Sequence, residues 1–433
     1  MIGIRQEDKS RWEARVPLVP ADLKRLLQDA HLKFQVQTSP IRAFADDEFR
    51  QAGAAVVTDL RECPIILSVK EIPPPLLEPG KTYLFFSHTI KHQPQNMPML
   101  RRLVELGCTL IDYERIVDAQ GRRLVFFGRY AGLAGMIDVL WALGQRLTHE
   151  GVPTSLATVR RAYAYKTLDD AKRELSQLAA QLRQEGLPAA VAPLVVGFAG
   201  YGHVSLGAQE IWNLFAPREI APDELGSISP GAQECFKVVF REEHMVARPD
   251  AAARRAPFDL QDYYSHPEKY RVKFFPYVRH LSVLINGIYW DARYPRLITR
   301  AQLRELWSES QRPRLRVLGD ISCDIEGSLE STVRATDPGN PVYVYEPHTG
   351  QTRDGVAGDG PVVLAVDILP CELPVDSSAH FSQSLSPFLA ALEQADFARP
   401  LEQSGLPAEL QGATIVYRGK LTEPYRHLES ELR

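Results

Sequence analysis

The 433-residue sequence lacks the features that mark membrane and secreted proteins. It contains no run of about 18 apolar residues, the length needed to cross a bilayer. Its start is charged from Arg5 onward and has no apolar core of a secretory signal, so we expect a cytoplasmic protein. Basic and acidic residues nearly balance, at 50 and 54, so we expect no binding to nucleic acid or to a membrane surface.

Cysteine is also scarce, and its spacing disfavours the usual cysteine sites. The five cysteines form no CxxC pair, so neither a disulfide framework nor a structural zinc site is expected. His88 and His92 are four residues apart, but no HExxH pattern surrounds them and Pro94 disfavours a regular helix there. We therefore expect no metal site. Apolar residues at 45% and charged residues at 24% are typical of globular domains.

The sequence does contain a glycine-rich turn between a strand-like and a helix-like segment, Leu194–Ala208. Gly200 and Gly202 allow positive φ and a close approach of main-chain N–H groups to phosphates, and the start of a helix favours negative charge. Ser205 stands where a third glycine is usual, so an ordinary strand–turn–helix is the alternative. The turn predicts a dinucleotide site in which Gly200, Gly202 and His203 lie nearest the pyrophosphate.

The chain before this turn alternates between strand and helix patterns. The expected strands are Phe34–Thr38, Pro64–Val69, Thr82–Ser87, Thr109–Tyr113 and Leu124–Phe127. The expected helices are Pro20–Ala30, Asp46–Ala52 and Met97–Leu106. Such alternation predicts a mostly parallel sheet covered by helices. A long helix over Tyr130–His149 is expected to connect this domain to a second one.

The second domain is expected to repeat the α/β pattern around the glycine turn. Its further elements are the helix Thr167–Glu185 and the strands Leu281–Ile285, Leu315–Ile321 and Val342–Tyr345. Residues 229–277, rich in charge, proline and aromatics, predict an insertion of loops and short helices. The amphipathic helix Asp376–Gln394 is expected to return the chain to the first domain. We predict an α/β fold with a substrate domain, residues 1–127 plus 365–433, and a Rossmann domain, residues 128–364.

Two ionisable side chains directly follow neighbouring strands. Lys70 follows PIILSV, and His88 follows TYLFFS. Because the carboxyl ends of parallel strands face the ligand in such folds, both are expected at one pocket. A histidine near neutral pKa and a lysine whose pKa falls on burial form a plausible acid–base pair. For each residue alone, a solvated lysine and a structural histidine are the alternatives.

Several motifs resemble those of a known family. They are IRQE, WEARVPL, SVKEIP, FFSHTIKHQ, LIDYE, GRRLVFFGRYAGLAGM, NGIYWDARYPRLIT and GDISCDIEGSLE. In this order they cover nearly the whole chain and resemble the lysine-forming saccharopine dehydrogenases, above all the lysine–ketoglutarate reductase half of aminoadipic semialdehyde synthase. The resemblance implies an alanine dehydrogenase-like enzyme with two Rossmann-like domains. Such an enzyme joins the ε-amine of L-lysine to 2-oxoglutarate and reduces the imine to saccharopine with NAD(P)H.

The resemblance also implies roles for individual residues. Lys70 and His88 are implied as the catalytic acid–base pair. The residues implied in substrate binding or tuning are Arg15, Lys91, Glu114, Arg123 and Phe127. Saccharopine carries three carboxylates, and guanidinium groups bind carboxylates through two hydrogen bonds, which supports the arginines independently. Surface ion pairs are the alternative for Arg15 and Arg123.

The cofactor choice depends on the strand that follows the glycine turn. About 20 residues beyond the glycines, an NAD-selective dehydrogenase usually presents Asp or Glu to the ribose. Here the segment Arg218–Ala221 ends in alanine with Arg218 close by, which favours NADPH, while Glu219 keeps NADH open. Asp320 is expected at the substrate and Asp324 at the cofactor, near the nicotinamide, with capping as the alternative role of both aspartates.

Together these observations predict an NAD(P)-dependent lysine–2-oxoglutarate reductase that closes to exclude water from the imine. Two alternatives stay open. One is an opine-type dehydrogenase with a different amine or oxo acid, and the other is a non-catalytic NAD(P)-binding sensor. The expected partners are the small-molecule substrates, and a separate enzyme is expected to oxidise saccharopine. A homodimer is the default assembly, because dimers are the commonest.

Overall fold

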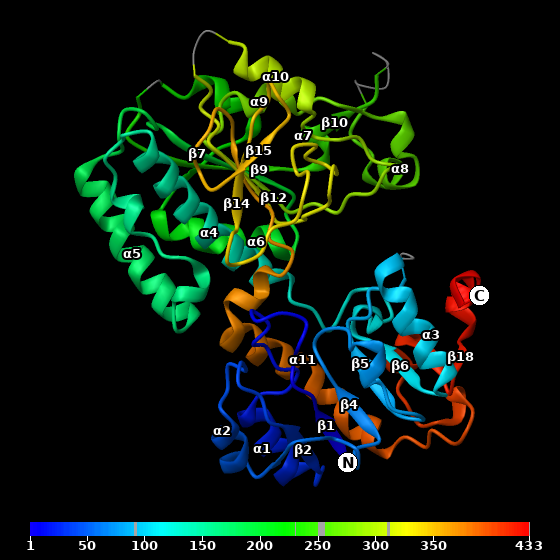
Figure 1. Ribbon diagram of the computed structural model, residues 1–433. Helices are drawn as coiled ribbons and strands as arrows, with labels where there is room; N and C mark the ends of the chain where they lie inside the picture. Colours follow the sequence, from blue (N-terminus) through cyan, green and yellow to red (C-terminus); the bar gives the residue numbers. More distant parts are fainter. Residues whose placement is uncertain (91–92, 230, 250–255, 310–311, 433) are drawn as a thin grey trace. The chain divides into compact units, whose positions relative to one another are not determined.

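The chain folds into two α/β units, each built on a mostly parallel sheet of eight strands (Figure 1). The computed structural model describes residues 1–90, 93–229, 231–249, 256–309 and 312–432. The first unit comprises Met1–Phe127 and Pro374–Arg433, and the second comprises Gly128–Leu373. This architecture confirms the predicted fold class. The returning segment was expected from residue 365, but residues 365–373 belong to the second unit.

The sheet of the first unit has the strand order β18-β17-β6-β5-β4-β1-β2-β3. Its strands are β1 (Ile2–Ile4), β2 (Phe34–Gln37), β3 (Ala55–Val57), β4 (Ile65–Leu67), β5 (Thr82–Phe85), β6 (Thr109–Asp112), β17 (Thr414–Tyr417) and β18 (Lys420–Leu421). The strands β1 to β6 are parallel, and β17 is antiparallel to both β6 and β18. The predicted strand Leu124–Phe127 is wrong, because this segment packs its aromatic side chains as the chain turns into a helix.

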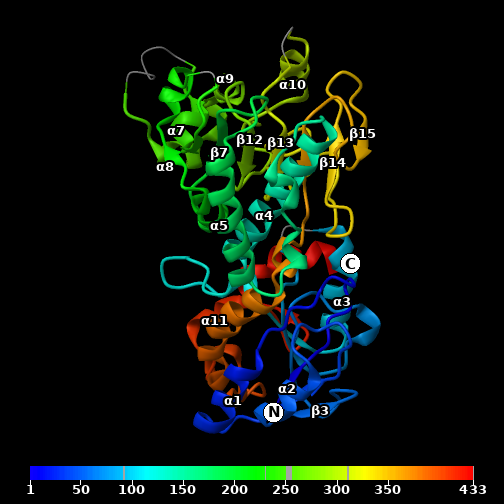
Figure 2. The same ribbon diagram turned by 90° about the vertical axis from the view of Figure 1, so that its left-hand side faces the viewer.

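The helices of the first unit are α1 (Pro20–Asp29), α2 (Asp46–Ala52), α3 (Met97–Glu105), α11 (Pro374–Gln394) and α12 (Ala408–Ala413). The returning helix α11 lies beside α1 (Figure 2). Its Ser378 and Ser382 hydroxyls accept the Val16 and Val19 N–H groups at 3.0 and 3.1 Å. Serines on its buried face thus fix the chain directly after Arg15.

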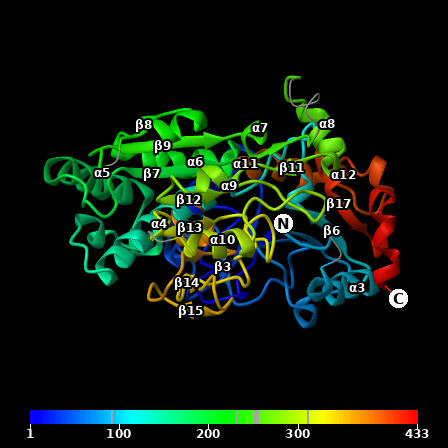
Figure 3. The ribbon, with the colours of Figure 1, turned by 90° about the horizontal axis from the view of Figure 1, so that it is seen from above.

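The sheet of the second unit has the order β15-β14-β16-β13-β12-β7-β9-β8, most of which Figure 3 shows side by side. Its strands are β7 (Leu194–Ala199), β8 (Arg218–Glu219), β9 (Cys235–Phe240), β12 (Val283–Asn286), β13 (Val317–Asp320), β14 (Val342–Tyr345), β15 (Thr352–Asp354) and β16 (Val362–Leu364). A separate antiparallel pair is formed by β10 (Val246–Ala247) and β11 (Arg271–Val272). The prediction of an insertion over 229–277 is wrong in part, since β9 is a strand of the main sheet, parallel to β7.

The helices of the second unit are α4 (Gly128–His149), α5 (Leu168–Glu185), α6 (His203–Trp212), α7 (Glu242–Met245), α8 (Leu260–Ser265), α9 (Phe275–Val278) and α10 (Arg300–Trp307). The core between α4, α5, α6 and the sheet occupies one face, and α9 and α10 pack on the other. Helices α4 and α6 touch through their backbones, because a Cβ at Gly132 would overlap the Val204 carbonyl and one at Gly207 the Arg129 carbonyl. The glycine turn is thereby held against the longest helix.

Candidate active site and cofactor site

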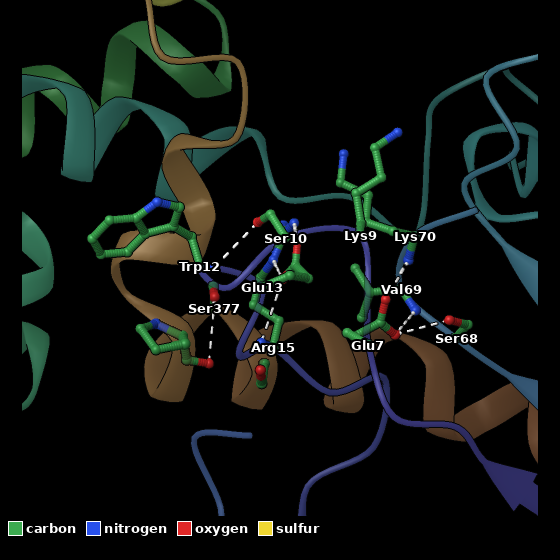
Figure 4. A network of polar contacts seen from close by, with 12 residues as sticks. Glu7, Lys9, Ser10, Trp12, Glu13, Arg15, Ser68, Val69, Lys70 and Ser377 are labelled. Atoms are coloured by element: carbon green, nitrogen blue, oxygen red, sulfur yellow. Dashed lines mark hydrogen bonds and ion pairs between the residues drawn. The ribbon is translucent and has the colours of Figure 1, made fainter. Parts of the chain in front are cut away.

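Lys70 lies just beyond the carboxyl end of β4, where a buried carboxylate holds its backbone. Glu7 accepts the Val69 and Lys70 N–H groups at 2.6 and 3.0 Å and the Ser68 hydroxyl at 2.9 Å (Figure 4). Burial, and secondarily the charge of Arg15, lowers the pKa of the half-buried Lys70 ammonium. A lysine with a lowered pKa is a better proton acceptor near neutral pH.

His88 follows β5 in a strained backbone conformation. Its φ is 49°, in the left-handed region, which costs a non-glycine residue on the order of 1–3 kcal/mol. The Asn96 amide donates to the His88 carbonyl oxygen at 3.2 Å, and the Ser87 N–H donates to the Asp112 carboxylate at 3.1 Å. The imidazole Nδ1 lies 3.4 Å from the Glu71 carboxylate. Contacts on both sides therefore hold this histidine at the strand end.

Glu71 links the two predicted catalytic positions. It follows Lys70 in the chain, and its Oε1 contacts both His88 and, at 2.5 Å, the Lys9 ammonium. Burial raises the pKa of Glu71, but its hydrogen bonds and its attraction to His88 and Lys9 outweigh burial and lower the pKa to about 2. The carboxylate is therefore ionised at neutral pH. No role for Glu71 was predicted from the sequence, in which its position next to Lys70 is the local signal.

Arg15 is buried, at 4% exposure, and its guanidinium is already paired. Its Nε and Nη2 donate to the two Glu13 oxygens at 2.7 and 2.5 Å. The guanidinium also lies over the Phe127 ring, 4.3 Å from the centroid, and Phe127 stacks on Phe381 at 4.5 Å. The structure thus brings together Arg15 and Phe127, two of the predicted substrate residues, and places Glu13 where a substrate carboxylate was expected.

Arg123 and Glu114, two further predicted substrate residues, form an ion pair with each other. The Arg123 side chain is half-exposed, so this pair lies in water and is weaker than the one at Arg15. The Glu114 N–H donates to Asp112 at 2.7 Å, which ties this pair to the end of β6. Lys91, the remaining predicted substrate residue, lies outside the described residues.

The glycine turn of the second unit has the geometry that close main-chain approach requires. Gly200 has φ 94°, and a Cβ there would lie 3.0 Å from Ile288. Gly202 precedes the first residue of α6, His203, which is exposed, and a Cβ at Gly202 would meet nothing within 4 Å. The first N–H groups of a helix have no carbonyl partner within the helix, so a helix start suits a phosphate. The residues present therefore fit the pyrophosphate of a dinucleotide.

A pocket of about 410 Å³ adjoins this turn. Its lining includes Gly200, Gly202, Glu242, Tyr263, Tyr264 and Tyr289. The Tyr264 hydroxyl donates to Glu242 at 2.7 Å, and the Arg241 guanidinium lies 4.7 Å from the Tyr201 ring centroid. The apolar walls with one carboxylate suit the adenosine part of a dinucleotide better than a small inorganic ion.

Arg218 lies far from the turn, which corrects its predicted role at the cofactor. In the sheet Arg218 pairs with Phe236, near the start of β9, whereas Phe240 at the other end pairs with Ala199. Four residues of strand separate these levels, about 13 Å at about 3.3 Å per residue. Arg218 instead packs over Phe236 and pairs with Glu234 at 3.6 Å. The alternative ribose residue, Glu219, pairs with Lys237 at 2.7 Å.

The residues at the position expected for ribose recognition are Arg241 and Glu242, directly after β9. Neither residue was predicted from the sequence, because residues 229–277 resemble loops and short helices. The run FKVVF from Phe236 to Phe240 was the available signal, and Lys237 within it obscured the apolar pattern. Lys237 is tolerated because its ammonium reaches Asn213 at 3.2 Å and Glu219 at the sheet edge.

Asp320 is engaged inside the second unit, at the end of β13. It accepts the Asn286 amide at 2.8 Å and the Thr332 hydroxyl at 2.5 Å, and it is 1% exposed. Burial raises its pKa to about 6. These contacts favour the capping alternative over a substrate contact. Asp324 is half-buried, and its carbonyl accepts the Gly327 N–H at 2.9 Å in a tight turn.

The described residues contain neither a metal-binding cluster nor a membrane-spanning helix. No group of three or more His, Cys, Asp or Glu side chains among them is arranged to hold a metal ion. None of their helices is long and apolar enough to cross a membrane.

Comparisons with known proteins agree with both units. Residues 3–134 match the family model of the alanine dehydrogenase/PNT N-terminal domain. The chain is 36% identical to alpha-aminoadipic semialdehyde synthase of Arabidopsis thaliana over 99% of its own length and 41% of the relative's. It is 28% identical to the lysine-forming, NAD(+) saccharopine dehydrogenase of Emericella nidulans, over 93% of this chain and 95% of that one. The chain thus spans less than half of the synthase but nearly the whole fungal enzyme.

A solved structure supports the same fold. An L-alanine dehydrogenase superposes with a TM-score of 0.64 at 18% identity, over 100% of this chain and 99% of that one. At this identity the likeness concerns the fold alone, while the sequence relatives carry the relationship. The chain is thus similar over nearly all of its length to alpha-aminoadipic semialdehyde synthases and to lysine-forming saccharopine dehydrogenases, and it has the fold of an L-alanine dehydrogenase.

Proposed function

We propose that this chain is a lysine–2-oxoglutarate reductase, which joins the ε-amine of L-lysine to 2-oxoglutarate and reduces the imine to saccharopine. The observation that carries the proposal is the placement of Lys70 and His88 after the neighbouring strands β4 and β5, with Glu71 in contact with His88. The similarity to alpha-aminoadipic semialdehyde synthase over 99% of the chain supports the choice of substrates.

The proposed reaction needs two groups that exchange protons at different stages. The lysine ε-amine must lose a proton before it attacks the oxo carbon, and the carbinolamine must then lose its hydroxyl as water. The lowered pKa of Lys70 suits it to accept the amine proton. His88 is proposed to donate a proton to the leaving hydroxyl, while Glu71 holds its ring. A bound nicotinamide supplies the hydride that reduces the imine.

Carboxylate binding is proposed for Arg15, Lys91 and Arg123, with Phe127 as an apolar wall. Arg15 is oriented by its stacking on Phe127 and by Glu13, so its guanidinium is presented in one geometry. A substrate carboxylate at Arg15 would displace Glu13 or share the guanidinium with it. Glu114 is proposed to tune the charge of this region through its pairing with Arg123.

For the cofactor we propose NADH, with NADPH as the alternative. Gly200, Gly202 and His203 are proposed to contact the pyrophosphate. Arg218, the residue in the sequence that favours NADPH, lies away from the turn. Glu242 lines the pocket beside the turn, and a carboxylate there accepts a ribose hydroxyl and repels a 2′-phosphate. The neighbouring Arg241 is the residue that supports NADPH.

The test is oxidation of NADH and of NADPH, followed by absorbance, with L-lysine and 2-oxoglutarate added together and then singly. Oxidation that requires both substrates supports the proposal, and its product should have the mass of saccharopine. Oxidation only with another amine or oxo acid points to a different opine-type dehydrogenase. Cofactor binding without oxidation of any amine and oxo acid pair points to a sensor. Cytoplasmic location, a homodimer and a separate saccharopine-oxidising enzyme stay predictions.

A further inference from the structure

Two buried carboxylates hold the strand ends that carry the proposed acid–base pair. Glu7, 6% exposed, binds the backbone of residues 69 and 70 and the Ser68 hydroxyl. Asp112, fully buried, accepts both the N–H and the hydroxyl of Ser87, the residue before His88. The two inner strands are therefore each fastened by a side-chain carboxylate at their carboxyl ends.

The sheet order explains why these two residues reach their targets. The strands run β6-β5-β4-β1, so β4 and β5 lie inside and β6 and β1 flank them. Asp112 is the last residue of β6, and Glu7 follows β1 after Arg5, whose N–H donates to Leu67 at 2.9 Å. Each flanking strand thus presents one carboxylate to the inner strand beside it.

The two fastened ends also bind each other. The Ser68 N–H donates to Leu84 at 3.0 Å, and the Phe86 N–H donates to Val69 at 3.1 Å, so the β4–β5 ladder continues past both strands. Val69 precedes Lys70, and Phe86 lies two residues before His88. A shift of either end would therefore change the separation of the two side chains.

We propose that Glu7 and Asp112 are positioning residues, which in their ionised form hold the Lys70 and His88 side chains at the separation that proton transfer needs. The proposal rests on the proposed function, because it assigns a purpose to the Lys70–His88 pair. The strained backbone of His88 needs such support, and Asn96 supplies the remaining contact on its carbonyl oxygen. Neither carboxylate is proposed to touch the substrate.

Ionising either carboxyl group inside the protein costs free energy. A role in positioning, which needs the ionised form, can therefore be distinguished from a role in stability alone. Burial, and then the charge of Glu13, raises the pKa of Glu7 to about 7. Burial raises the pKa of Asp112 to about 6, with Glu114 adding to the shift. Tyr113 is the ionisable group that both carboxylates influence. Asp112 also acts on the ionisable Tyr425. On the side of Glu7, Lys70 carries a titratable ammonium and donates its backbone N–H to the Glu7 carboxylate.

A rise in pH through the pKa of Glu7 is expected to lower stability and to raise activity. A carboxyl whose folded pKa is raised favours folding below its unfolded value near 4.5, and this contribution is lost as the pH rises through about 7. The Val69 and Lys70 N–H groups each donate to a different Glu7 oxygen, and a proton on either oxygen weakens that oxygen as an acceptor. Activity should therefore rise over the pH range in which Glu7 lowers stability.

The experiment compares Glu7→Gln and Asp112→Asn with wild type in the full chain. We expect kcat for lysine and 2-oxoglutarate to fall on the order of 10- to 100-fold, since misplacement by about 1 Å costs as much. The Kd of NADH should stay within about twofold. The acid limb of kcat in wild type, with an apparent pKa near the 7 of Glu7, should disappear in Glu7→Gln. Glu7→Asp should restore part of the limb.

The matched control is Asp22→Asn. Asp22 is a buried carboxylate of the same unit that accepts the Ser382 hydroxyl at 2.6 Å, away from β4 and β5. The Asp22→Asn variant should have a lower melting temperature than wild type and an unchanged pH profile of kcat. Glu7→Gln should lower the free energy of unfolding less at pH 8 than at pH 5, because at pH 8 the wild type carries the buried charge.

If a carboxylate variant fails to fold, Ser68→Ala and Ser87→Ala remove one donor each and leave the carboxylates in place. We expect kcat to fall about fivefold in each, the effect of about one hydrogen bond. Unchanged kcat in all folded variants, or a loss that only follows the melting temperature, overturns the inference. Wild type without turnover on lysine and 2-oxoglutarate would instead contradict the proposed function, so the two failures differ.

Discussion

The strand ends of the first unit and the glycine turn of the second present their ligands with different parts of the chain. After β4 and β5 the candidate groups are side chains, Lys70 and His88, and their surroundings are charged. At the turn the candidate groups are main-chain N–H groups around Gly200 and Gly202, and the lining of the adjoining pocket includes five tyrosines.

This difference decides which substitutions each region tolerates. A side-chain site depends on ionisation, so a neutral replacement of equal size damages it. A main-chain site needs room for the phosphate beside the backbone and the right φ angles, so an added methyl group weakens binding there. Side-chain charge matters only at the ribose.

Removal of the acid–base pair should give the largest effect. Lys70→Met and His88→Ala should each lower kcat about 10²- to 10⁴-fold, the usual contribution of general acid–base catalysis. The Kd of NADH should not change, because the turn lies in the other unit. Steady-state kinetics and fluorescence titration of NADH measure the two quantities. Lys24→Met, at an exposed position of α1, is the control. Wild-type turnover in both variants would remove the pair from the mechanism.

A methyl group at the glycine turn should give the reverse pattern. In Gly200→Ala the residue must keep φ near 94° beside Ile288, at a cost of about 1–2 kcal/mol, so stability and NADH affinity should both fall, the latter about 5- to 30-fold. In Gly202→Ala the methyl group meets no protein atom within 4 Å, so the melting temperature should stay while affinity falls. Calorimetry and NADH titration test this. Unchanged affinity in both variants would place the pyrophosphate elsewhere.

The carboxylate after β9 should set the choice of cofactor. Glu242→Gln removes the charge that faces the pocket, so the ratio of kcat/KM for NADPH over NADH should rise about fivefold, or about 1 kcal/mol. Glu243→Gln, at the exposed neighbouring position, is the control and should leave the ratio unchanged. A wild-type preference for NADPH that Glu242→Gln does not alter would instead assign the choice to Arg241.

The sequence predicted what local patterns determine. Helices such as α1 and strands such as β14 follow from periodicity, and the positions of Lys70 and His88 follow from the strands before them. Contacts between distant segments leave no local pattern. Glu7 is 61 and 63 residues from Ser68 and Lys70, so its hold on the strand end was not predictable from either segment.

The errors in the second unit have a similar cause. Periodicity reports burial, and β9 contains a lysine whose ammonium is satisfied by Asn213, so the strand resembled a charged loop. A sequence reading without β9 puts β8 beside the glycine turn and therefore puts Arg218 at the ribose. The sheet order, which no local signal encodes, corrects both.

Arg218→Ala should therefore give the smallest effect. Arg218 lies near the start of β9, and its exposed pair with Glu234 contributes at most about 1 kcal/mol to the free energy of unfolding. The Kd values of NADH and NADPH should both stay within about twofold of wild type, measured by fluorescence titration. Arg241→Ala is the comparison, since it follows the carboxyl end of the same strand and should weaken binding of NADPH more than that of NADH. A selective loss of NADPH affinity in Arg218→Ala would mean that β8, and not β9, carries ribose recognition. The contrast between the two units would then rest on the glycine turn alone.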